Sequence, residues 1–182
     1  MTELDKRALR NAFGSFMTGV TVVTTLDADK APIGFTANSF TSVSLDPPLL
    51  LISLAKSSSN LANFESAEGF AVNILSEQQR DVANVFASRV EDRFAKVAWY
   101  RSPEGRPLLK DVCAWFDCSM HQQVEAGDHV LLIGKIQAFD QDLERDGLGY
   151  VRGAFYHPSL IERASASLRL EPCTISLAMR ES

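Results

Sequence analysis

The chain has 182 residues, of which 46% are hydrophobic and 23% are charged, and this is the composition of an ordinary globular domain. A domain of this length buries roughly 70% of the surface that its unfolded chain exposes, so it needs neither disulfides nor a metal ion to hold a core. Eighteen basic and 23 acidic residues give a net charge of -5, which argues against general binding to nucleic acids or anionic membranes, because a negatively charged protein repels polyanions.

The first third of the chain predicts a helix followed by strands. Apolar residues recur at helical spacing over residues 4–16. The β-branched run at 20–26, the turn residues Asp-Ala-Asp-Lys and a second run at 31–45 predict a β-hairpin with an extension. The unbroken apolar run at 49–55 then predicts a strand that is buried on both faces.

The middle third predicts short helices and a strand. Three serines at 57–59 are suited to capping a short helix that begins near residue 60. A strand is expected at 70–75, and a helix with one apolar face at 77–88. The stretch at 89–111 has neither helical nor strand periodicity, so we expect a long ordered loop, and such loops usually serve a site.

The last third predicts strands at 114–124 and 129–139, joined by a four-residue turn, and a final β-segment at 150–156. We therefore expect one mainly β domain over residues 1–157 with three or four peripheral helices. Its short connections favour a barrel over a doubly wound sheet. The C-terminal extension at 158–182 could be a helix, a strand or a docked arm.

Several familiar motifs are missing from the sequence. No G-x-G-x-x-G follows an early strand, and neither a phosphate-binding P-loop nor a G-x-S-x-G nucleophile motif occurs. Cys118 and His121 lie three residues apart in a predicted strand and point to opposite faces, so we predict no metal site. The odd number of cysteines and the charged N-terminal segment lead us to expect a cytoplasmic protein without a membrane span.

Two consecutive β-segments end in polar side chains. Residues 34–44 contain six hydroxyl or amide side chains, and residues 53–60 contain four serines, Lys56 and Asn60. Such groups suit an elongated ligand that has a phosphate at one end and a hydrogen-bonding ring at the other. The competing interpretation is that these residues occupy exposed strand faces and a helix cap.

A set of motifs, in order over about residues 10–157, resembles the short-chain flavin reductase family. The first two are Phe16-x-Thr18-Gly19-Val20-Thr-Val-Val-Thr and Gly34-x-Thr36-Ala37-Asn38-Ser39-Phe40-Thr41-Ser42-Val43-Ser44-Leu45-x-Pro47-Pro48. The later ones are Asp92-Arg93-Phe94, Pro107-Leu108-Leu109, Gly127-Asp128-His129 before a strand that contains Gly134, and Arg152-Gly153. Each motif alone is weak, whereas the ordered set is specific.

This resemblance implies an FMN-binding split β-barrel of Greek-key-like topology, usually a homodimer. It also implies that FMN, or FAD, is bound and reduced by NADH or NADPH, and that the reduced flavin passes to a partner monooxygenase. Because the nicotinamide stacks transiently on the flavin in this family, a separate dinucleotide-binding domain is not required. The alternative is a non-catalytic or electron-transfer FMN protein of the same fold, and a sugar- or nucleic-acid-binding barrel is more remote.

The resemblance also assigns cofactor-binding residues by position. The residues expected along the isoalloxazine ring and ribityl chain are Thr36, Ala37, Asn38 and Ser39. Those expected along the ribityl chain and phosphate are Ser53, Ala55, Lys56, Ser57, Ser59 and Asn60. Arg89 and Arg93 are candidates for the phosphate or the nucleotide tail, with a surface ion pair as the competing role. Arg152 completes the set.

His129 is the candidate catalytic residue. Its place after a Gly-Asp turn puts it at a strand end, where the imidazole could position nicotinamide or donate a hydrogen bond to reduced flavin. The competing interpretation is a histidine at a hairpin rim without a role. Phe155 stands where the family often has tyrosine, so a phenol donor is not expected there.

Overall fold

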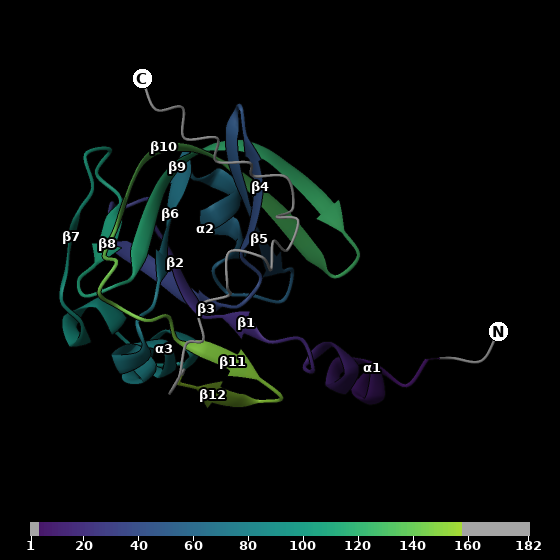
Figure 1. Ribbon diagram of the computed structural model, residues 1–182. Helices are drawn as coiled ribbons and strands as arrows, with labels where there is room; N and C mark the ends of the chain where they lie inside the picture. Colours follow the sequence, from purple (N-terminus) through teal and green to yellow (C-terminus); the bar gives the residue numbers. More distant parts are fainter. Residues whose placement is uncertain (1–3, 158–182) are drawn as a thin grey trace, which may run out of the picture.

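The centre of the fold is a seven-stranded sheet whose neighbouring strands all pair antiparallel (Figure 1). The computed structural model describes residues 4–157. In space the strands run in the order β3-β2-β6-β9-β10-β5-β4. Their bounds are β2 Thr21–Leu26, β3 Pro32–Ala37, β4 Thr41–Leu45, β5 Pro48–Ala55, β6 Gly69–Ile74, β9 Ala114–Ala126 and β10 His129–Gln141. Because β3 and β4 form opposite edges, the short connection between them crosses from one edge to the other.

The sheet curls around a hydrophobic core that helix α2 (Leu61–Ser66) completes (Figure 1). Phe64 of α2 is fully buried and packs with Ile52 of β5 and Phe70 of β6. Phe35 of β3 meets the Phe64 ring edge to face, with ring centroids 5.1 Å apart. Burial of one phenylalanine side chain contributes about 1.5–3 kcal/mol, so Phe64 anchors this short helix.

A second core lies between the sheet and helix α3 (Arg80–Ala87). Ala83 and Phe86 are the buried residues of α3, and they pack with Val22 of β2. Gly34 of β3 allows this close approach, because a Cβ atom there would lie 2.8 Å from a backbone oxygen of β2 and 3.2 Å from the Phe86 ring. Helix α3 is therefore held directly against the edge strand β3.

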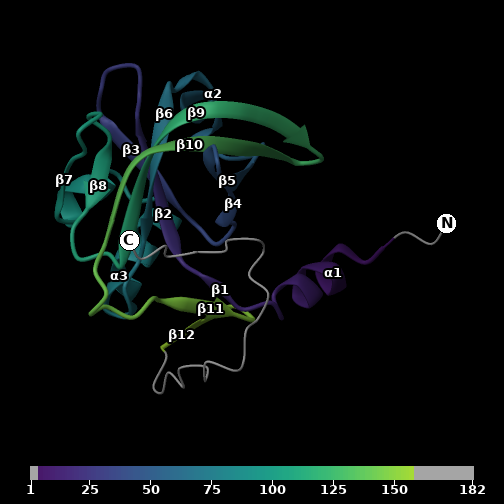
Figure 2. The ribbon, with the colours of Figure 1, turned by 45° about the horizontal axis from the view of Figure 1, so that its top comes forward.

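Smaller elements surround the sheet. Strands β1, β11 and β12 form one small sheet, and β7 and β8 form another. The bounds of these strands are β1 Thr18–Gly19, β7 Trp99–Arg101, β8 Pro107–Leu109, β11 Gly149–Val151 and β12 Ala154–Tyr156. The remaining helical elements are α1 Lys6–Phe13 and the two 3-10 helices η1 Glu77–Gln79 and η2 Arg93–Lys96. Helix α1 buries none of its residues and points away from the sheet (Figure 2).

The structure confirms the mainly β class and most of the predicted elements. The helix within residues 4–16, the strands at 20–26 and 70–75 and the long β9–β10 hairpin are all present. No helix within residues 4–157 is both long and apolar enough to cross a membrane. The extension at 158–182 lies outside the described residues.

Two expectations about buried segments are wrong. The strand at 49–55 is buried on one face only, because its alternate side chains are half-exposed on the other face. The stretch at 89–111 is not a loop throughout, since it contains η2 and the β7–β8 hairpin. Leu108 and Leu109 of β8 are buried, and a strand of three residues is too short to show a period.

Two expectations about connections are also corrected. The run at 31–45 divides into β3 and β4 around residues 38–40, and the two strands lie on opposite edges. The serines do not cap α2, whose N-cap residue is Asn60 without a side-chain hydrogen bond. Instead, Ser58 Oγ accepts a hydrogen bond from the Asn60 amide at 3.2 Å, which shapes the turn before the helix.

Candidate functional site

A cleft of about 810 Å³ lies where β3 ends. Its walls come from the connection between β3 and β4, the end of β5 with the turn that follows, the end of α3 with the loop behind it, and the first residue of β10. Four separate parts of the sequence therefore meet there. The volume lies within the range of small-molecule sites, roughly 300–1,000 Å³.

Twelve of the fourteen predicted site residues line this cleft. They are Thr36, Ala37, Asn38, Ser39, Ser53, Ala55, Ser57, Ser59, Asn60, Arg89, Arg93 and His129. Lys56 and Arg152 are not among its lining residues. The chain brings the twelve together only through its fold, because β3, β5 and β10 occupy different positions in the sheet.

Two hydroxyl groups hold the cleft walls together. Ser39 Oγ donates to the Ser53 carbonyl oxygen at 3.1 Å and accepts from the Ser53 amide at 3.0 Å. Thr36 Oγ1 donates to the Ala83 carbonyl oxygen at 2.6 Å and so ties β3 to α3. A hydroxyl group has a single proton to donate. Toward a ligand, both groups are therefore hydrogen-bond acceptors.

The Asp92-Arg93-Phe94 motif fixes one wall of the cleft. The Arg93 guanidinium donates to the Ser88 carbonyl oxygen at 2.6 and 3.2 Å and to the Gly34 carbonyl oxygen at 3.1 Å. Phe94 is buried and meets Phe86 edge to face at 5.1 Å between ring centroids. Arg93 thus connects the loop after α3 to strand β3. The sequence offered two roles for Arg93, a phosphate contact or a surface ion pair, whereas the hydrogen bonds in the structure go to backbone carbonyl groups.

The turn after β5 offers unused hydrogen-bond donors. The Ser58 amide donates to the Ala55 carbonyl oxygen at 2.9 Å, whereas the amides of Ser57 and Ser59 donate to no acceptor among the described residues. Arg89, from the loop after α3, lines the same cleft and forms no ion pair within residues 4–157. Amides, hydroxyl groups and a guanidinium are the donors that bind phosphate oxygens.

His129 begins β10 and pairs with Ala55 of β5. Its side chain is 42% exposed, and its Nδ1 atom lies 2.7 Å from Asp128 Oδ1. The hydrogen bond to the imidazole, and then the charge of its protonated form, lower the pKa of the Asp128 carboxyl group. Because Asp128 holds Nδ1, the Nε2 atom is the ring nitrogen left for a ligand.

The two residues outside the cleft have other neighbours. Lys56 Nζ binds Glu125 Oε2 at 2.8 Å, and this hydrogen bond, with the charge of the lysine, lowers the pKa of Glu125. Arg152 has a left-handed backbone, with φ 49°, and lines an adjoining groove of about 670 Å³. Asn38 lines both the groove and the cleft, so Arg152 could contact only a ligand that extends past Asn38.

The cleft also contains residues that the sequence pattern did not single out. They are Phe35, Leu54, Phe86, Ala87, Ser88, Val90 and Glu91, whereas Ser58, which also lines the cleft, is one of the four serines noted at 53–60. Periodicity identifies Leu54 and Phe86 as core residues, and it carries no signal that part of each side chain reaches a cleft. Val90 and Glu91 belong to the stretch at 89–111 that was expected to serve a site, and Ser88 ends the helix that was expected at 77–88.

A family model described as "Flavin reductase like domain" matches residues 13–159, which is most of the chain. This chain belongs to that family. The family assignment expected from the motifs is therefore confirmed, and the matched residues include the whole of the cleft in this flavin reductase-like protein.

Curated relatives of this flavin reductase-like chain carry related names. It is 59% identical over 160 residues to a Rhizobium meliloti protein named "Probable flavin reductase". This match covers 88% of this chain and 51% of that protein. It is 56% identical over 163 residues to the reductase component of the flavin-dependent trigonelline monooxygenase of Acinetobacter baylyi. This second match covers 87% of this chain and 52% of that protein. The chain thus spans about half the length of these two relatives.

A solved structure shares the fold. The NADH:FAD oxidoreductase of Streptomyces globisporus, in complex with NAD and FAD fragments, matches with a TM-score of 0.82 and 37% sequence identity. The match covers 90% of this chain and 100% of that chain. The sequence match and the structural match therefore lead to the same family.

Proposed function

We propose that this chain is an NAD(P)H-dependent flavin reductase whose split β-barrel domain spans residues 1–157, with a C-terminal extension at 158–182. The observation that carries the proposal is the convergence of twelve predicted flavin-site residues in one cleft. The names of its relatives, which are flavin reductases and monooxygenase reductase components, support the same activity. FMN or FAD binds in the cleft, and NADH or NADPH supplies the hydride.

The donors of the cleft fit a phosphorylated flavin. The turn amides of Ser57 and Ser59, together with Arg89, hold the phosphate, because they are the donors that the protein itself leaves unused. Asn38 and Asn60 bring amide side chains that both donate and accept, which suits a ring and a ribityl chain with several polar atoms. A local site of this kind allows a chain of net charge -5 to bind an anionic cofactor.

His129 positions the hydride donor. A bound flavin supplies the hydride-accepting ring, so the protein needs no nucleophile of its own. Its task is to hold the reacting atoms at near-attack separation, roughly 3–3.5 Å. The Asp128 carboxylate accepts a hydrogen bond from Nδ1–H and so fixes the imidazole. In the neutral ring Nε2 accepts a hydrogen bond from the nicotinamide carboxamide N–H, and in the imidazolium form it donates one to the carboxamide oxygen or to reduced flavin.

The flavin reductase acts as a homodimer that serves a monooxygenase. The reductase component of the Acinetobacter baylyi monooxygenase supports such a partner. Apolar side chains on the outer face of β5 and β10 support the dimer. Leu51 pairs with Ile133 in register, and both are half-exposed although neighbouring residues in the same strands are buried. A second copy on this face would remove them from water.

Steady-state kinetics with the four pairings of FMN or FAD and NADH or NADPH tests the proposed reaction. We expect nicotinamide oxidation that requires added flavin and saturates with it, with one flavin and one donor preferred. Tightly bound FMN without oxidation of either donor would contradict the proposal and favour an electron-transfer flavoprotein.

A further inference from the structure

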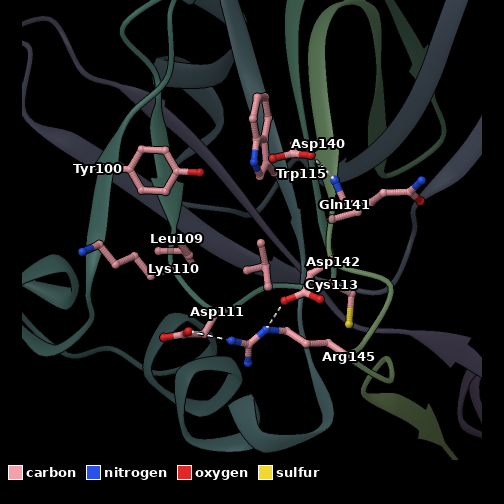
Figure 3. Close-up of a pocket in the computed structure, with 12 residues that line it drawn as sticks. Tyr100, Leu109, Lys110, Asp111, Cys113, Trp115, Asp140, Gln141, Asp142 and Arg145 are labelled. Carbon is pink, nitrogen blue, oxygen red and sulfur yellow. Dashed lines mark hydrogen bonds and ion pairs between the residues drawn. The ribbon is translucent and has the colours of Figure 1, made fainter.

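A second cavity, of about 410 Å³, lies at the other end of β10 from His129 (Figure 3). It is lined by the middle of β7, the segment from the end of β8 to the start of β9, and the end of β10 with the turn that follows it. None of its lining residues also lines the flavin cleft. The cavity is therefore a separate place on the molecule, at the opposite end of a strand of 13 residues.

The charges of this cavity leave one carboxylate without a cationic partner. Arg145 binds Asp111 at 2.9 Å through Nη2 and Asp142 at 2.8 Å through Nε (Figure 3). The Asp140 carboxylate accepts a hydrogen bond from the adjacent Gln141 amide at 2.9 Å. With Lys110, the lining carries three aspartates against two basic residues, a net charge of -1. The cavity thus favours a cation.

Two aromatic side chains line the cavity together with Asp140. Tyr100 comes from β7 and Trp115 from β9; Trp115 lies beside Asp140, and the Tyr100 hydroxyl group points toward Trp115 (Figure 3). Tyr100 is 40% exposed. Burial, and then the charge of Asp140, raise the pKa of its hydroxyl group. Aromatic rings combined with a carboxylate are the groups that bind ammonium heads.

We propose that this cavity binds a small organic cation with a methylated ammonium head. Asp140 supplies the opposite charge, and the Tyr100 and Trp115 rings contact the methyl groups. Arg145 stays bound to its two aspartates and forms a wall of the cavity. The net negative charge disfavours flavin and nicotinamide phosphates, so this site and the flavin cleft take different ligands.

Calorimetric titration of the full chain with choline tests the proposal, with 3,3-dimethylbutan-1-ol as an uncharged probe of the same shape. We expect choline to bind at millimolar concentration or below and the alcohol to bind at least about tenfold more weakly, since the charge is the feature that is recognised. Equal binding of the two probes, or no choline binding at millimolar concentration, would overturn the proposal.

Asp140→Asn should weaken choline binding about tenfold, the scale of one charge contact combined with ring contacts. Asp29→Asn is the matched control, because it removes the same charge from an exposed turn outside the cavity and should bind choline as the unmodified chain does. Equal affinities of the two variants would contradict the proposed site. Their flavin affinity, which should not change, reports that each is folded.

A second pair of variants keeps the test independent of Asp140. Tyr100→Leu removes the ring and should weaken choline binding severalfold, whereas Tyr100→Phe keeps the ring and should bind choline nearly as well as the unmodified chain. Equal loss in both variants would assign the effect to the hydroxyl group and contradict the proposed contact with the ring.

Discussion

The basic side chains around the flavin cleft differ in what already binds them. Lys56 is paired with Glu125, and Arg93 donates to two backbone carbonyl groups. Arg89 lines the cleft and has no ion-pair partner among residues 4–157. Sequence alone could not separate these roles, because Glu125 lies 69 positions from Lys56. The structure thus makes Arg89 the side chain most available to a phosphate.

Arg89→Ala should weaken FMN binding by about tenfold or more, since a hydrogen bond to a charged group contributes about 1.5–3 kcal/mol. Riboflavin has no phosphate, so its affinity should change little. Lys56→Ala is the control that removes the same charge outside the cleft. Quenching of flavin fluorescence measures all four affinities. A larger loss of FMN binding in the lysine variant, or equal losses for both flavins, would remove Arg89 from the phosphate site.

His129→Ala should lower turnover about tenfold or more and change flavin affinity less, because the imidazole positions the hydride donor and does not hold the flavin. Measurement of kcat and of the flavin Kd on the same variant separates the two effects. Loss of flavin binding with unchanged turnover at saturating flavin would show that the residue serves the cofactor instead.

Cys118 should resist thiol reagents in the folded protein. It is fully buried, and burial, with the charge of Asp117, raises the pKa of its thiol to about 12. The thiolate is the reactive form, so a raised pKa lowers reactivity at neutral pH. Mass spectrometry after alkylation at neutral pH should find Cys118 modified only when denaturant is present. Rapid modification of the native chain would contradict this burial.

At the scale of elements, β10 curls closely over the core because Gly134 has no side chain. A Cβ atom there would lie 2.7 Å from the Cβ atom of Cys118 in β9 and 2.8 Å from the ring of Phe70 in β6. Three strands therefore approach one another at this glycine. A methyl group would have to push the two neighbouring side chains aside in a closely packed core.

Gly134→Ala should lower the free energy of unfolding by about 1–3 kcal/mol, the usual cost of an added methyl group in a packed core. Gly147→Ala is the control, because nothing lies within 4 Å of its added Cβ atom. Urea denaturation of both variants provides the comparison. Equal stabilities would show that the core has room at Gly134.

The sequence predicted the elements that carry a clear local pattern. The hairpin of β2 and β3 follows from a β-branched run around turn residues, and the long hairpin of β9 and β10 follows from two segments of strand length joined by turn residues. Strand β8 was missed because three residues cannot show a period. The separation of β4 from β3 was also missed, since a strand pattern does not specify which strand will be its neighbour. The candidate cleft depends on that crossing, and the family motifs, rather than periodicity, located its residues.

At the scale of the whole molecule, the half-exposed outer face of β5 and β10 should be the dimer contact. Ile133→Glu places a charge on this face and should convert the dimer to a monomer, because an unpaired charge is costly to bury. Gln78→Glu, at an exposed position of η1 outside β5 and β10, is the control. Light scattering after size exclusion gives the mass of each variant. A monomeric unmodified chain would contradict the proposed dimer.

The most direct test of the account is anaerobic mixing of the flavin-loaded chain with NADH and with NADPH. If the hydride donor and the flavin meet in the cleft lined by Thr36, Arg89 and His129, as we propose, hydride transfer should be direct. We therefore expect the visible absorbance of the flavin to be lost at a rate that saturates with the preferred donor and falls in His129→Ala. A chain that binds flavin while neither donor bleaches it would contradict the account.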